Sequence, residues 1–144
     1  ALDTEGWWAR REVKPGKGAG GARPATPPGF VAVDHDEITG KTVGWEPIEQ
    51  SGFAKFHADA LSHVDDDTIE PGTYELCGPK VNRNPEDFAG HVLVRHGRWD
   101  LGPDVPLDYD GLCGFLMDDK FVHEGIVWHH PDGRMAKLKK RDFA

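Results

Sequence analysis

The C-terminal segment constrains the fold more than any other part of this chain. Two short runs with β-type composition, residues 124–128 and 135–139, stand on either side of the sequence Pro131-Asp132-Gly133. Asp-Gly dipeptides favour tight turns between strands. The segment is therefore predicted to fold as a β-hairpin.

Alternation along these strands predicts which side chains share a face. Lys137 and Lys139 are expected on one face and Leu138 on the other, toward a core, while Glu124 and Ile126 share a face of their own strand. A carboxylate and two ammonium groups on adjacent strands would form a polar floor. Such a floor could hold a metal-bound polyphosphate, with the cations on phosphate oxygens and the carboxylate on the metal. An ordinary surface hairpin also carries lysines, so both interpretations remain open from spacing alone.

Composition favours a small α+β domain. The 144 residues include 38% hydrophobic residues, five Trp and seven Phe, enough to build one core, while 18 Gly and 11 Pro favour short strands and turns over long helices. Apolar side chains recur at helical spacing over residues 52–64, and a second short helix is expected within 108–119. The remaining strands are predicted at residues 7–13, 30–33, 42–45, 73–77 and 91–95. The expected architecture is one domain, 1–144, with mainly antiparallel sheets and one or two helices.

Several motifs resemble those of a known superfamily. Glu-Gly-Ile-Val at 124–127 and Lys-Leu-Lys at 137–139 resemble motifs IV and V of the covalent nucleotidyltransferases, which comprise ATP-dependent DNA ligases, RNA ligases and mRNA capping enzymes. Residues 72–85 resemble motif III, and residues 6–13 resemble the strand that carries motif Ia. RNA ligases match better than DNA ligases, whose motif IV normally begins with Asp. The resemblance covers about residues 7–143 and implies the nucleotidyltransferase (ATP-grasp-like ligase adenylation) fold.

The resemblance implies a role for each residue of the polar floor. Glu124 is expected to bind Mg²⁺ or Mn²⁺ at the phosphates of ATP, and Lys137 and Lys139 are expected to neutralise the α-phosphate. Ile126 would lie under the adenine. In motif III, Glu75 would accept hydrogen bonds from the ribose hydroxyls.

Glu75 also has a simpler interpretation. It stands between apolar residues in a strand made for burial, so it needs a partner, which could be a neighbouring cation such as Lys80 instead of the ribose. If the family arrangement holds, Glu75 and Lys139 should converge on one pocket that also contains Glu124 and Lys137.

Three further residues are candidates for the same pocket. Arg10 or Arg11 is expected to meet a substrate phosphate or the ribose, and alternation allows only one of the two on the active face. His96 occupies the region of motif IIIa and is expected to line the nucleotide pocket. Because it replaces the usual aromatic residue, the partner that stacks on adenine stays unassigned.

The defining motif of the superfamily, Lys-x-Asp-Gly, does not occur in these 144 residues. Its lysine attacks the α-phosphate of ATP to form a lysyl-AMP phosphoramidate. Residues 1–5 read as the middle of a strand or hairpin, so the chain is expected to begin a few residues after that lysine, as an adenylyltransferase domain that is partial at its N-terminus. Alone, it is expected to lack ligase activity.

Charge and cysteine content limit the partners. The net charge of −8 argues against a uniformly basic nucleic-acid binder, although basic residues cluster near both ends. No apolar run reaches membrane-spanning length, and two cysteines without a disulfide pattern favour a cytoplasmic protein. The resemblance to RNA ligases implies the function: ATP-dependent ligation of RNA ends, or less favourably DNA ends. The alternatives are a non-catalytic module that binds nucleotides or nucleic acid and, third, a capping-type GTP transferase.

Overall fold

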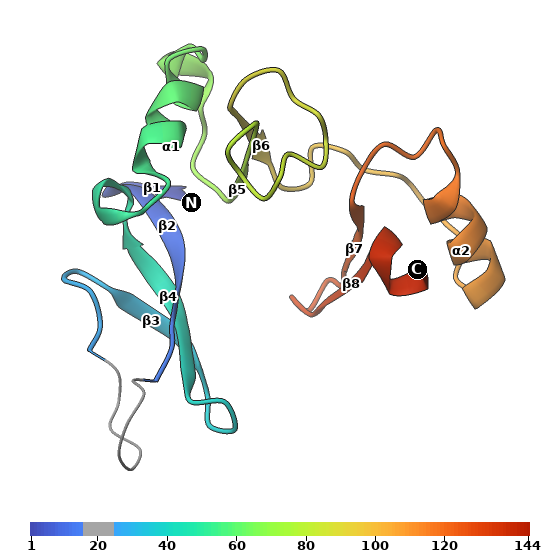
Figure 1. Cartoon of the computed structure of the whole chain (residues 1–144), viewed down its shortest axis with the longest axis horizontal. Helices are drawn as coiled ribbons and strands as arrows, with labels where there is room; N and C mark the ends of the chain where they lie inside the picture. Colours follow the sequence, from blue (N-terminus) through green and yellow to red (C-terminus); the bar gives the residue numbers. More distant parts are fainter. Residues whose placement is uncertain (16–24) are drawn as a thin grey trace. The chain divides into compact units, whose positions relative to one another are not determined.

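The computed structural model describes residues 1–15 and 25–144 as two compact units (Figure 1). The first unit comprises Ala1–Leu76 and His91–His96, and the second comprises Cys77–Gly90 and Gly97–Ala144. That both belong to one adenylyltransferase domain stays a prediction.

A four-stranded antiparallel sheet forms most of the first unit, with the order β1-β2-β4-β3 (Figure 1). The strands span Leu2–Asp3 (β1), Gly6–Val13 (β2), Val31–Asp36 (β3) and Lys41–Pro47 (β4). β1 and β2 form a hairpin, so the predicted strand or hairpin near residue 1 is confirmed. In β3 the register shifts between Ala32 and Asp34, which is a β-bulge in this edge strand.

Hydrogen bonds to the Asp36 side chain stabilise the turn between β3 and β4. One oxygen of Asp36 accepts hydrogen bonds from the N–H groups of Ile38 and Thr39 at 2.9 and 3.2 Å, and the other accepts one from the Thr39 hydroxyl at 2.7 Å. Gly40 then adopts a φ of 68°, which glycine tolerates without steric cost. Because this turn begins at Asp36, β3 extends to that residue, three positions beyond the predicted end at 33.

The helix predicted at 52–64 is present as α1, Ala54–Leu61, after a single 3₁₀ turn η1, Ile48–Gln50. It is shorter than predicted because the chain tightens at its end: the N–H groups of His63 and Val64 bond to carbonyls three residues back. α1 buries His57 and Ala60, and the His57 ring lies 4.6 Å from the Trp7 ring.

A two-stranded sheet completes the first unit. Its strands are β5, Tyr74–Cys77, of which only Cys77 belongs to the second unit, and β6, Val92–Arg95. α1 packs against β6, where the rings of Phe56 and His91 stack at 4.8 Å. A short 3₁₀ turn, η2, Asp66–Thr68, precedes β5.

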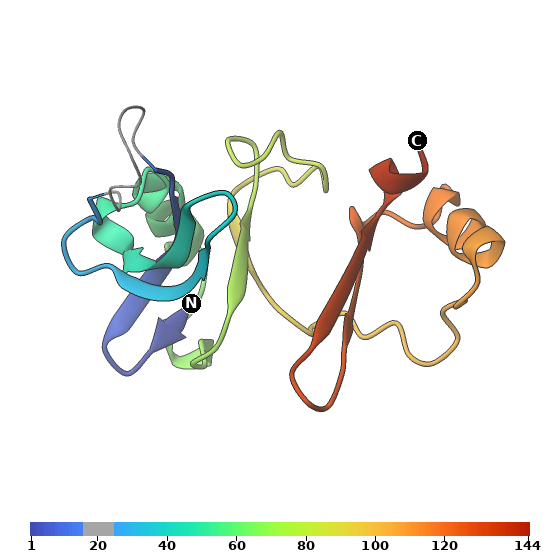
Figure 2. The same cartoon turned by 90° about the horizontal axis from the view of Figure 1, so that it is seen from below.

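The second unit contains α2, Tyr109–Met117, the strands β7, Gly125–His129, and β8, Met135–Lys139, and the 3₁₀ turn η3, Lys140–Phe143 (Figure 2). The side chain of Asp108 caps α2 by accepting a hydrogen bond from Gly111 N at 2.8 Å. β7 and β8 pair antiparallel, so the predicted hairpin is confirmed. η3 follows β8 directly and lies against α2.

The core of the second unit lies between α2 and the hairpin. Leu116 is 0% exposed and contacts Phe121 and Ile126, which are 8% and 6% exposed. Partly buried apolar side chains surround these three: Val105, Leu112, Phe115, Trp128, Leu138 and Phe143.

The predicted α+β class, with antiparallel sheets and few helices, is confirmed. Within residues 1–15 and 25–144, none of the helices has the length and apolar composition needed to cross a membrane.

Replacing Leu116 with Ala should lower the free energy of unfolding by about 2–5 kcal/mol, because the side chain is fully buried and its loss leaves a cavity. The neighbouring Met117 is 53% exposed, so Met117→Ala serves as the control and should cost about 0.5 kcal/mol or less. Urea unfolding followed by circular dichroism measures both. Equal losses in the two variants would contradict this account of the core.

Candidate functional site

The register of the hairpin assigns its side chains to two faces. Ile126 pairs with Leu138, and both face the core, whereas Gly125 pairs with Lys139 and Val127 with Lys137. Lys137 and Lys139 therefore share the opposite face, as alternation predicted.

Gly125 is required by the close approach of the two strands. A Cβ atom at this position would lie 2.2 Å from the carbonyl oxygen of Leu138 and 2.8 Å from the Cα of Lys139. Both are backbone atoms, which no side-chain movement displaces. The glycine thus allows the start of β7 to lie directly against the end of β8.

This approach brings together Glu124 and Lys139, two of the charged residues that the motifs singled out. Glu124 Oε1 lies 2.5 Å from Lys139 Nζ, and Lys140 N donates to Glu124 O at 3.0 Å. The Lys139 side chain is 18% exposed and the Glu124 side chain 38%, so this is a partly buried ion pair. The backbone of Lys139 is also fixed, because its N–H donates to Asp142 Oδ2 at 2.8 Å.

Glu124 does not follow the strand alternation used in the prediction. β7 begins at Gly125, so Glu124 precedes the strand and its carboxylate reaches the face of Lys139, while Ile126 is buried in the core. The expected grouping of Glu124 with Ile126 on one face is therefore wrong. The contact of Ile126 with adenine stays a prediction.

Three cations act on the carboxylate of Glu124. Its pKa is lowered from the ordinary value of 4.5, first by the hydrogen bond from Lys139, against the opposing effect of partial burial, and further by the charges of Lys139, Lys137 and Arg141. Lys137 and Arg141 are exposed and form no ion pair with another described residue. The site is therefore locally positive, and it combines carboxylate oxygens with exposed cations.

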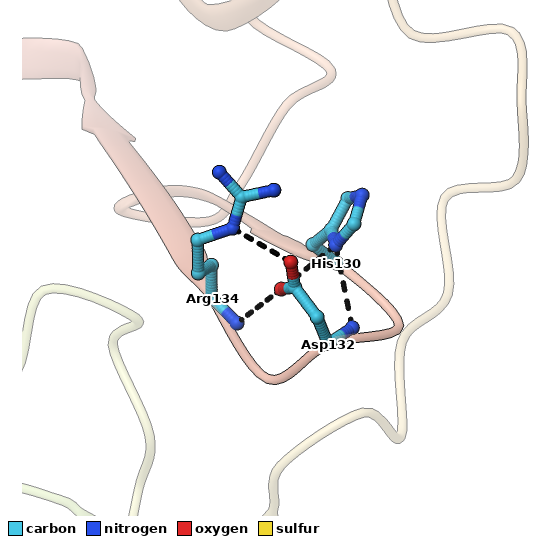
Figure 3. Close-up of polar contacts among 3 residues, drawn as sticks. All are labelled: His130, Asp132 and Arg134. Atoms are coloured by element: carbon cyan, nitrogen blue, oxygen red, sulfur yellow. Dashed lines mark hydrogen bonds and ion pairs between the residues drawn. The ribbon is translucent and has the colours of Figure 1, made fainter.

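The turn of the hairpin carries a second charged group (Figure 3). Asp132 lies between His130 Nδ1, 2.7 Å from Oδ1, and Arg134 Nε, 2.8 Å from Oδ2. The pKa of Asp132 is lowered, first by the hydrogen bond from the backbone N–H of Arg134. Gly133 adopts a φ of 90° and donates to His130 O at 2.9 Å, which confirms the predicted turn. Each charge here has a partner inside the turn, so we assign this group to stabilising the hairpin.

Glu75 lies in β5 of the first unit and is exposed. The inference that its burial demands a partner is therefore wrong, and it forms no ion pair with Lys80 or with another described residue. Its binding to ribose and its convergence with Lys139 stay predictions.

Arg10 and Arg11 point to opposite faces of β2, as expected. Arg11 NH1 lies 3.8 Å from Glu46 Oε1, a carboxylate on β4 whose side chain is only 3% exposed, while Arg10 is opposite Trp45 in the register and exposed. His96 follows β6, and its Nδ1 lies 2.9 Å from the hydroxyl of Thr73.

Sequence reasoning missed an aromatic series next to Glu124. The ring of His123 lies tilted against that of Trp99, with centroids 4.8 Å apart, and contacts Phe121 edge-on at 5.5 Å. Trp99 lies 24 positions before His123, outside every motif, so no local pattern could have joined them.

Comparison with known proteins finds similarity to one family. The family described as RNA ligase 1 matches residues 49–144. RNA ligase 1 of Danio rerio is 28% identical over 131 residues, which cover 78% of this chain and 39% of the relative. RNA ligase 1 of Pongo abelii is 29% identical over 98 residues, which cover 64% of this chain and 29% of the relative. The chain thus spans well under half the length of these curated relatives.

The ion pair of Glu124 should make a pH-dependent contribution to stability. Because its pKa is lower in the folded protein than the ordinary 4.5, the contribution is present above pH 4.5 and is lost as the pH falls through the lowered pKa. Glu124→Gln should therefore lower the free energy of unfolding by about 1 kcal/mol or less at pH 7, since the pair is partly exposed, and by less at pH 3. Urea titrations at both pH values measure this.

The matched control is Asp119→Asn, which neutralises an exposed carboxylate in the same unit that has no partner among the described residues. Its effect should be smaller than that of Glu124→Gln at pH 7. A cost of Glu124→Gln that stays the same from pH 7 to pH 3 would show that the ion pair does not stabilise the hairpin.

Proposed function

The chain belongs to the RNA ligase 1 family, and we propose that it holds most of the nucleotide-binding pocket of an ATP-dependent RNA ligase with the nucleotidyltransferase fold. The observation that carries this proposal is the partly buried contact of Glu124 with Lys139, beside Lys137 and Arg141. Ammonium groups bind the phosphate oxygens of a nucleoside triphosphate, and a carboxylate beside them binds its metal ion.

The reaction that we propose for the complete protein has three steps. The amine of a lysine in a Lys-x-Asp-Gly motif attacks the α-phosphorus of ATP, so that a P–N bond forms, pyrophosphate leaves with the electron pair of the broken P–O bond, and the amine loses a proton. An oxygen of the 5′-phosphate of a strand then attacks the phosphorus of the lysyl-AMP, so that a P–O bond forms, the P–N bond breaks and the released lysine amine takes up a proton. Finally, a 3′-hydroxyl attacks the activated 5′-phosphate, forming the phosphodiester bond and releasing AMP.

Within this reaction, Lys137 and Lys139 would stabilise negative charge on the α-phosphate as each attack proceeds. Lys137 is exposed and its ammonium is available to a ligand. Lys139 has three N–H donors, so it can keep its contact with Glu124 and still donate to a phosphate oxygen. Fixed charges that need no rearrangement are effective in transition-state stabilisation.

Glu124 is the residue that would hold Mg²⁺ or Mn²⁺. Its Oε1 is engaged by Lys139, whereas Oε2 has no hydrogen bond or ion pair with a described residue, and hard oxygen ligands suit these ions. Among the described residues, no group of three or more His, Cys, Asp or Glu side chains is arranged to hold a metal ion. A metal bound here would therefore be shared with the phosphates of ATP, where it would neutralise part of their charge.

The remaining contacts of the nucleotide are proposed from the family motifs. Glu75, being exposed, is free to accept hydrogen bonds from the ribose hydroxyls. Arg10 has no ion-pair partner among the described residues and suits a phosphate better than Arg11, which lies near Glu46. His96 and Ile126 would line the adenine side. We further propose RNA ends as the substrate, with DNA ends as the weaker option, and the cytoplasm as the location.

A non-catalytic module that binds nucleotides or nucleic acid is the second candidate. One observation favours it: the 144 residues contain no Lys-x-Asp-Gly motif. The two candidates differ in whether full-length protein takes up label from ATP into a covalent adduct. Uptake of label from GTP would instead indicate a capping-type transferase.

The 144-residue chain alone should form no covalent adenylate, because none of its lysines stands in the nucleophile motif. Incubation with α-labelled ATP and Mg²⁺, followed by denaturing electrophoresis, tests this, with full-length protein as the positive control. A labelled band at the 15.9 kDa of the chain would refute the assignment of the nucleophile.

In the full-length enzyme, Glu124→Ala and Lys137→Ala should each reduce adenylate formation by about 100-fold or more, since loss of one transition-state charge contact costs roughly 3–4 kcal/mol. Lys120→Ala removes an exposed lysine of the same unit and should leave the rate unchanged. Near-wild-type adenylation in either site variant, with the fold intact by circular dichroism, would remove that residue from the active site.

A further inference from the structure

A continuous series of aromatic rings runs from the core of the second unit to its surface. Phe115 contacts Phe121 at 5.3 Å, Phe121 contacts His123 at 5.5 Å, and the His123 ring lies tilted against Trp99, with centroids 4.8 Å apart and an interplanar angle of 36°. Phe121 is 8% exposed and Trp99 49% exposed. The series therefore ends in an indole that is supported from one side and open to solvent.

Trp99 is exposed, but its ring is held in place by a contact with the His123 ring. The imidazole beneath it is held edge-on by a buried ring, and the backbone carbonyl of Phe121 accepts a hydrogen bond from Lys140. Fixing His123 in this way limits the positions that the indole can adopt on it. A preorganised ring loses little conformational freedom when a flat ligand stacks on it.

The exposed cations of the same unit indicate the class of ligand. His123 directly precedes Glu124. The carboxylate of Glu124 accepts a hydrogen bond from Lys139, and the charges of Lys137 and Arg141 help to lower its pKa. Lys137 and Arg141 are exposed and have no ion pair with another described residue, so both are available to anions. The chain as a whole has a net charge of −8, so a local group of cations favours a polyanion as the ligand.

Proteins that bind single-stranded nucleic acid combine exposed aromatic rings, on which bases stack, with Lys and Arg side chains that meet the phosphates. The second unit carries both kinds of group. We propose that Trp99, supported by His123, is a stacking platform for a base of single-stranded RNA, and that phosphates of the same strand bind Lys137 and Arg141 of this unit. The proposal rests on the proposed function for the choice of RNA as the strand. The stacking itself depends on the contacts of Trp99 alone.

Anisotropy of a short fluorescein-labelled single-stranded oligoribonucleotide tests this with the 144-residue chain. Trp99→Ala should weaken binding by about ten-fold, which corresponds to about 1.4 kcal/mol, while Trp99→Phe should keep most of the affinity because a ring remains. The control is Phe53→Ala, which removes an aromatic side chain of similar exposure, 46%, from the first unit.

A second probe separates stacking from charge. An abasic oligonucleotide with the same number of phosphates should bind more weakly than the RNA and should not distinguish Trp99→Ala from the parent chain. Lys137→Ala and Arg141→Ala should weaken the binding of both probes and reduce its salt dependence.

Three results would overturn the proposal: no measurable binding of the RNA probe, equal affinity in Trp99→Ala and the parent chain, or a loss in Trp99→Ala that affects ATP and not RNA. The last result would assign the indole to the adenine. Adenylation by the full-length enzyme is measured separately, so a failure of the proposed function is distinguishable from a failure of the platform.

Discussion

The close approach of β7 and β8 at Gly125 determines the geometry of the charged site. Even one methyl group there would lie 2.2 Å from the carbonyl oxygen of Leu138, so the register between the strands depends on this glycine. The same register turns Ile126 and Leu138 toward Leu116 and leaves the lysines on the outer face. Hydrophobic burial on one face thereby positions the charges on the other.

The ion pair of Glu124 and Lys139 adds orientation more than stability. A partly exposed pair of this kind contributes little net free energy, because desolvation of both groups offsets their attraction. What it does provide is a lysine whose ammonium group has a defined position next to a carboxylate. Lys137, two residues earlier on the same face, has no such partner among the described residues and stays available for a ligand.

The elements of this fold were predictable from local pattern, whereas the site was predictable only in part. Strand alternation and the Asp-Gly turn predicted the hairpin, and apolar spacing predicted both helices. Alternation failed for Glu124, because the residue before a strand does not follow the strand's geometry. The burial expected for Glu75 was wrong, because apolar neighbours along a short strand do not make every position buried. The contact of Trp99 with His123 depends on tertiary structure and has no local signal.

The edge of the larger sheet has a consequence for association between molecules. β3 is the last strand in the order, and its outer side pairs with no other strand in the described part of the chain, although Val31 and Val33 are 53% and 66% exposed. An open edge with apolar side chains normally invites a strand from a second molecule. Here the bulge between Ala32 and Asp34 interrupts the regular row of hydrogen-bonding groups, and Asp34 and Asp36 would repel an identical strand. β3 is thus a poor template for fibre-like stacking.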